Sequence, residues 1–100
     1  MYWNLRDNER LITALYIANT PDLLRNFLKD LLTEKEIELL SRRLRVACLL
    51  HDGAPYSEVR KITGLGYATI AQISKKLADK RGGYNSIIRQ MNPHGQRYFD

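Results

Sequence analysis

Cysteine is almost absent from this sequence, since Cys48 is the only one among 100 residues. A single cysteine cannot form a disulfide within the chain. Long hydrophobic runs are also missing, and no apolar stretch approaches the roughly 18 residues that a membrane-spanning helix needs. The first ten residues show no basic start, apolar segment or cleavage site of a secretory signal. We therefore expect no membrane partner and a place in the reducing cytoplasm.

Side chains that could support catalysis or bind a metal are equally scarce. Cys48, His51 and His94 are too few and too poorly spaced for a zinc site, and the apolar surroundings of Cys48 predict a buried, inert thiol. Residues 64–69, GLGYAT, resemble part of a dinucleotide-binding loop, but such a loop follows a strand and the context here is helical. We expect no enzyme, no metal and no cofactor.

The charges are distributed unevenly along the chain. Residues 1–41 carry five basic and seven acidic side chains, whereas residues 42–81 carry nine basic and three acidic ones. A basic middle segment with a net charge of +6 is typical of a surface that faces a polyanion. The alternative is a solvated basic face without any partner.

Capping residues and helical spacing predict two helices in the first part of the chain. Asn4 can cap a first helix that continues to about Asn19. Thr20 and Pro21 then fit the N-cap and the first position of a second helix, where the missing N–H of proline costs nothing.

A longer third helix is predicted from Thr33 to about His51. Thr33 and Glu36 fit a capping box, and Gly53 can close the far end of the helix. The apolar residues of this helix point in nearly every direction, which predicts a central helix surrounded by others.

The remaining pattern completes an all-α fold of about six helices with no strand. Pro55 opens a short fourth helix, a fifth follows, and Gly82-Gly83 should break the fifth before a last short helix. We predict a single domain over residues 1–100, divided into dimerisation helices (1–53), a helix-turn-helix (55–77), a C-terminal helix (82–92) and a tail (93–100).

The segment SEVRKITGLGYATIAQI, residues 57–73, fits a helix-turn-helix, in which two short helices meet at a steep angle around a turn that often contains glycine. Gly64 can adopt the positive φ that this corner needs, and Gly66 can free the backbone where the second helix begins. The residues expected to face into the corner are Val59, Ile62, Leu65, Ile70 and Ile73.

In a helix-turn-helix the N-terminal end of the second helix enters the major groove of DNA. Small side chains allow close approach there, and threonine and glutamine can bond to base edges. The residues predicted to contact bases are Tyr67, Ala68, Thr69, Ala71 and Gln72. The residues predicted to contact phosphates are Arg60, Lys61, Lys75 and Lys76. Tyr84 should pack the last helix against the motif. In an alternative interpretation of this segment, Lys80 and Arg81 contact DNA phosphate.

The segments LLTEKEIELLSRRLRVACLL and EVRKITGLGYATI resemble the Trp repressor family over residues 31–77. Thr63 departs from the family pattern, which has leucine there. The continuation KKLADKRGGYNSII resembles that of small bacterial Trp repressor-like proteins with a Gly-Gly-Tyr segment after the motif. The resemblance implies an intertwined homodimer whose two recognition helices read a palindromic operator on double-stranded DNA.

Only some residues of the family's tryptophan-binding pocket are present in this sequence. The resemblance places its two stacking arginines at Arg43 and Gln72, its glycine at Ile73, and a nearby threonine at Thr33. A glutamine amide does not replace a stacked guanidinium, and the isoleucine fills the space that the glycine leaves. These four residues are the possible effector pocket, and we expect its ligand not to be tryptophan.

The sequence thus predicts a homodimeric, cytoplasmic, bacterial DNA-binding regulator of transcription, a repressor. It does not reveal whether a small-molecule effector exists. The alternative is a protein-interaction or adaptor module that keeps the helix-turn-helix fold without specific DNA binding. RNA binding has little support, because Tyr67 is the main exposed aromatic candidate for base stacking.

Overall fold

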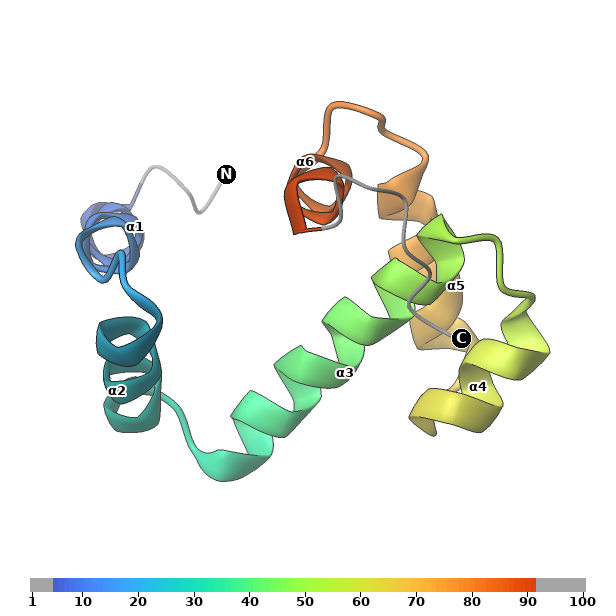
Figure 1. Ribbon diagram of the computed structural model, residues 1–100, viewed down its shortest axis with the longest axis horizontal. Helices are drawn as coiled ribbons and strands as arrows, with labels where there is room; N and C mark the ends of the chain where they lie inside the picture. Colours follow the sequence, from blue (N-terminus) through green and yellow to red (C-terminus); the bar gives the residue numbers. More distant parts are fainter. Residues whose placement is uncertain (1–4, 92–100) are drawn as a thin grey trace. The chain divides into compact units, whose positions relative to one another are not determined.

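The computed structural model describes residues 5–91, and this part of the chain contains six helices and no strand (Figure 1). The prediction of an all-α fold is therefore confirmed. The chain divides into two compact units, residues 1–37 (the first unit) and residues 38–100 (the second unit). Asn4, His94 and the predicted tail lie outside the described residues, and the predicted division into functional segments stays a prediction.

The first unit contains two helices joined by a short linker. Helix α1 (Arg6–Ile17) follows Leu5, whose backbone is extended and whose side chain cannot act as a cap. Helix α2 (Pro21–Leu31) begins as predicted, because the backbone N–H of Leu23 donates to Thr20 Oγ1 at 3.2 Å and Pro21 occupies the first helical position. The linker contains the buried Ala18.

Neither α1 nor α2 buries a residue fully, although both carry an apolar stripe. The stripes meet around an apolar hollow of about 230 Å³. Its lining residues are Ala14, Ile17, Ala18, Leu23 and Phe27. The first unit therefore has almost no core of its own.

Helix α3 (Glu34–His51) opens with the predicted capping box. The N–H of Glu36 donates to Thr33 Oγ1 at 3.1 Å, and the N–H of Thr33 donates to Glu36 Oε1 at 2.8 Å. The bond from the Thr33 backbone, followed by the bond with its side chain, lowers the pKa of the Glu36 carboxyl. The far end closes as predicted, because Gly53 has a φ of +92° and its N–H donates to the carbonyl of Leu50.

Within a single chain, α3 is surrounded as predicted only near its C-terminal end. The segment 46–49 is buried, but Leu39 and Leu40 are exposed. The apolar residues in the first half of α3 are thus not covered within a single chain.

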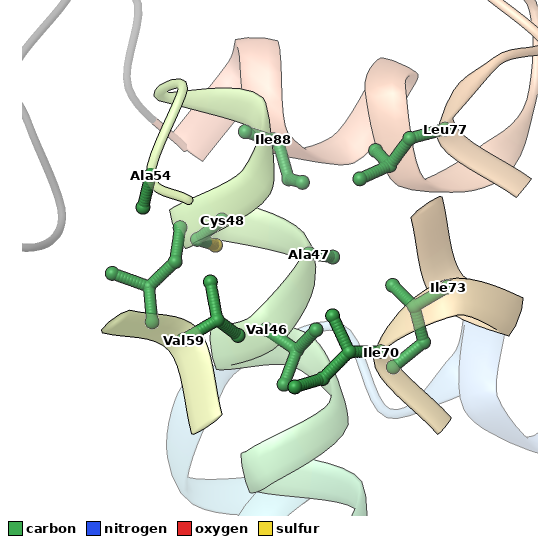
Figure 2. Close-up of a cluster of buried hydrophobic side chains, with 10 residues drawn as sticks. Val46, Ala47, Cys48, Ala54, Val59, Ile70, Ile73, Leu77 and Ile88 are labelled. Atoms are coloured by element: carbon green, nitrogen blue, oxygen red, sulfur yellow. The ribbon is translucent and has the colours of Figure 1, made fainter. Parts of the chain in front are cut away.

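The core of the second unit forms where the end of α3 meets α4 (Tyr56–Thr63), α5 (Tyr67–Leu77) and α6 (Gly83–Met91). Figure 2 shows side chains from all four helices converging on one cluster. The buried cluster consists of Val46, Ala47, Cys48, Leu49, Ala54, Val59, Ile70, Ile73, Leu77 and Ile88. Tyr84 is partly buried against it, as predicted. Burial, and then the charge of Asp52, raises the pKa of the Cys48 thiol, which favours its protonated form.

Gly82-Gly83 does not break α5, contrary to the prediction. The helix ends at Leu77, five residues before Gly82. The buried side chain of Asn85 accounts for the earlier end, because its Nδ2 donates to the carbonyls of Leu77 and Asp79, each at 2.9 Å. Gly82 has a different role, since a Cβ there would lie only 3.1 Å from the Asp79 carbonyl oxygen.

Candidate nucleic-acid interface

Helices α4 and α5 form the predicted helix-turn-helix, with residues 64–66 as the corner. Gly64 has a left-handed backbone (φ +74°), and its N–H donates to the carbonyl of Arg60 at 2.8 Å. A side chain at this position would be strained, which confirms the predicted role of Gly64. Gly66 has an ordinary φ of −74°, and a Cβ there would meet no atom within 4 Å. The corner therefore does not need a glycine at position 66, contrary to the prediction.

The inner face of the corner contains most of the predicted side chains. Val59, Ile70 and Ile73 are buried, and Leu65 is partly buried against them. Ile62 is not part of this core, because it is 36% exposed. Thr63 is buried instead.

The hydroxyl of Thr63 explains how a polar residue fills this place. Its Oγ1 donates to the carbonyl of Val59 at 2.8 Å and accepts the N–H of Leu65 at 3.3 Å. The bonds satisfy the hydroxyl inside the core, so its burial carries little penalty. The four-residue spacing between Val59 and Thr63 was the signal available in the sequence, since residues four apart share a helix face.

The outer face of α5 presents the residues predicted to contact bases. Four of them, Tyr67, Ala68, Ala71 and Gln72, are exposed, and Thr69 is half-buried. The opposite face is held in the core by Ile70, Ile73 and Leu77. Helix α5 is therefore anchored on one side and free to meet a ligand on the other.

Basic side chains flank this face. Arg60 and Lys61 lie in the last turn of α4, and Lys75 and Lys76 lie in the last turn of α5. All four are exposed, and none of them pairs with a carboxylate of residues 5–91. Their charges therefore remain available to an anion.

One contact within this surface was not predicted from the sequence. The Arg60 guanidinium carbon lies over the Tyr67 ring, 4.7 Å from its centroid. The contact joins the last turn of α4 to the first residue of α5. Residues seven apart on different helices give no periodic signal, so only the corner geometry reveals this pair.

The turn after α5 presents Lys80 and Arg81, which are also exposed. The N–H of Arg81 donates to Asp79 Oδ1 at 3.0 Å, and Arg89 Nη1 donates to the carbonyl of Lys80 at 3.3 Å. Together with Asn85, these bonds hold the turn in a defined conformation.

The residues of the possible effector pocket lie in different environments. Thr33 belongs to the first unit, where the capping box already engages its hydroxyl. Arg43 is half-buried, Gln72 is exposed, and Ile73 is a core residue that is 2% exposed. Ile73 therefore fills space within the core of this chain, and the pocket itself stays a prediction.

Other kinds of site find no support in the part of the chain that the structure describes. Within residues 5–91 no three acidic, histidine or cysteine side chains gather as metal ligands would. None of the helices described is both long and apolar enough to span a bilayer. His51 is exposed, with Nδ1 at 3.9 Å from Asp52 Oδ1.

Comparison with known proteins agrees with this geometry. Residues 7–92 match the family described as Trp repressor protein. An uncharacterized protein of Bacillus subtilis (strain 168), YerC, is 39% identical over 62 residues, which are 62% of this chain and 60% of YerC. The match thus spans less than two thirds of that relative's length. No solved structure matches the chain. With a helix-turn-helix in place and a family match that covers most of the sequence, the chain belongs to the Trp repressor family of DNA-binding regulators.

Proposed function

We propose that this protein is a sequence-specific regulator of transcription, a repressor, that binds double-stranded DNA in the bacterial cytoplasm as a homodimer. Its two recognition helices read the half-sites of a palindromic operator, because the two-fold symmetry of a dimer matches that of its site. The observation that carries the proposal is the outer face of α5, which is exposed, lined by small and polar side chains, and flanked by unpaired cations.

Each part of this surface has a role that its chemistry supports. Ala68 and Ala71 allow the helix to approach thymine methyl groups, and Thr69 and Gln72 can bond to base edges. Lys61, Lys75 and Lys76 neutralise phosphates on either side of the groove, which supplies affinity for any sequence. Tyr67 lies at the start of the same face.

The residues at the positions of the family's tryptophan pocket differ from the family pattern. Gln72 cannot stack on an indole as a guanidinium does, and Ile73 is a core residue that is 2% exposed. We therefore propose that tryptophan is not the corepressor.

The test is selection of bound fragments from random duplex DNA, with and without tryptophan, near physiological salt. We expect a palindromic consensus bound on the order of a thousand-fold more tightly than random DNA in both conditions. A consensus that appears only with tryptophan would refute the effector proposal. No enrichment in either condition would contradict sequence-specific regulation and favour the adaptor function.

Substitutions on α5 should separate base readout from phosphate contact. Thr69→Ala and Gln72→Ala are expected to reduce discrimination between the consensus and mismatched duplexes by about 1–3 kcal/mol. Lys75→Ala should weaken binding to all duplexes alike and lower the salt slope by about 1. Fluorescence anisotropy titrations at several salt concentrations measure both quantities. If Thr69→Ala and Gln72→Ala weaken every duplex equally, these two residues do not read bases.

A further inference from the structure

The contact between Arg60 and Tyr67 sets Arg60 apart from the other cations beside α5. Its guanidinium carbon lies over the Tyr67 ring at 4.7 Å from the centroid, well within the distance of about 6 Å at which a cation is attracted to a ring face. Lys61, its neighbour on α4, has no such ring contact among the described residues. The chain therefore holds one cation of the surface in place.

The backbone around the corner fixes both partners of this contact. The carbonyl of Arg60 accepts the N–H of Gly64 at the end of α4, and Tyr67 is the first residue of α5. The inner faces of both helices are anchored in the core through Val59 and Ile70. The two side chains thus extend from rigid positions on either side of the turn.

A guanidinium over a ring face still has its N–H donors available at its edge. These donors match the oxygens of a phosphate in a bidentate arrangement, which the ammonium of lysine cannot reproduce. Arg60 pairs with no carboxylate of residues 5–91. A phosphate is thus the chemical group that suits this free, oriented edge.

We propose that Tyr67 is a positioning residue, whose ring holds the Arg60 guanidinium ready to bind one DNA phosphate beside the recognition helix. The proposal rests on the proposed DNA-binding function and deepens it. It replaces the base contact that the sequence predicted for Tyr67 with a role exerted through Arg60. The remaining base readout then belongs to the side chains that follow Tyr67 on α5.

A double-mutant cycle tests this role on a short duplex of random sequence, since a phosphate contact does not depend on sequence. Tyr67→Ala is expected to weaken binding roughly two- to five-fold when Arg60 is present, and to have no effect in an Arg60→Ala background. Arg60→Ala should lower the salt slope by about 1. Tyr67→Phe keeps the ring face and should bind like the wild type, and this rescue separates positioning from loss of fold.

The matched control is Lys61→Ala, which removes an exposed cation from the same turn of α4. Its effect should add to that of Tyr67→Ala, because no contact couples the two side chains. Circular dichroism of each variant verifies the fold. Arg60, Lys61 and Tyr67 are all exposed, so their substitution should leave the fold intact.

The possible outcomes distinguish the proposal from the function on which it rests. Salt-dependent binding by the wild type, with additive effects of Arg60→Ala and Tyr67→Ala, would overturn the positioning role alone. Loss of binding in Tyr67→Phe would also overturn it and assign the effect to the hydroxyl. A wild-type protein that binds no duplex would contradict the proposed function, and the positioning role with it.

Discussion

Ile70→Ala is expected to lower the free energy of unfolding by about 2–5 kcal/mol, a large part of the roughly 5–15 kcal/mol that stabilises a typical domain. Ile70 is 0% exposed and belongs to the cluster that joins α3, α4 and α5 (Figure 2). Its truncation removes apolar contacts and leaves a cavity that rigid neighbours cannot close completely. Because the same residue anchors the inner face of α5, DNA binding should weaken as the motif loosens.

Urea unfolding followed by circular dichroism measures this loss, and Ile62→Ala is the matched control. The control deletes the same atoms from a side chain of α4 that is 36% exposed, so its cost should be well below that of Ile70→Ala. Equal losses in the two variants would show that Ile62 is also buried in solution, and that the corner core described above is incorrect.

The sequence predicted best those features that depend on neighbouring residues alone. The N-cap at Thr20, the capping box at Thr33 and the glycine closures at Gly53 and Gly64 were all confirmed. Each involves residues within a few positions of one another, where backbone geometry and hydrogen-bonding capacity determine the result.

Features that depend on packing between helices were harder to predict. The choice of Thr63 over Ile62 for the core depends on how α4 rotates against its neighbours, and a hydrophobicity pattern favours the isoleucine. The end of α5 depends on Asn85, a residue of α6 that reaches back to two carbonyls. Only the four-residue spacing from Val59 signals the burial of Thr63, and no local pattern signals the effect of Asn85 on the end of α5.

The candidate site shows the same division. Exposure of the outer face of α5 follows from the periodicity of its buried residues, so sequence reasoning found that face. The contact between Arg60 and Tyr67 requires the angle of the corner, which no spacing rule supplies. The sequence therefore predicted the chemistry of single residues, but it did not predict which of their side chains are in contact.

Phe27→Asp is expected to abolish the homodimer that we propose, together with much of the fold. Helices α1 and α2 bury no residue fully, and the first unit leaves large apolar side chains exposed. The exposed set is Leu5, Ile12, Tyr16, Ile17, Leu23 and Leu31. An apolar surface of this kind is typical of an interaction site. Phe27 also lines the apolar hollow between α1 and α2.

A carboxylate at position 27 would have to leave water when a second copy covers this stripe. An unpaired buried charge costs about 3–5 kcal/mol, and a two-fold interface contains the substituted residue twice. In an intertwined dimer the same contacts form the core of each chain, so loss of association and loss of helix content should occur together. Leu24 lies three positions before Phe27 in α2 and so shares its helix face, and Leu24→Asp should behave in the same way.

Sedimentation equilibrium and far-ultraviolet circular dichroism measure the two effects, and Asn26→Asp is the matched control. That substitution adds the same charge to an exposed polar position of α2, so the dimer should persist. A Phe27→Asp variant that stays dimeric would show that this stripe is not the interface. A variant that is monomeric but fully folded would show that the chains pack side by side and are not intertwined, since only an intertwined core makes the fold of each chain depend on its partner.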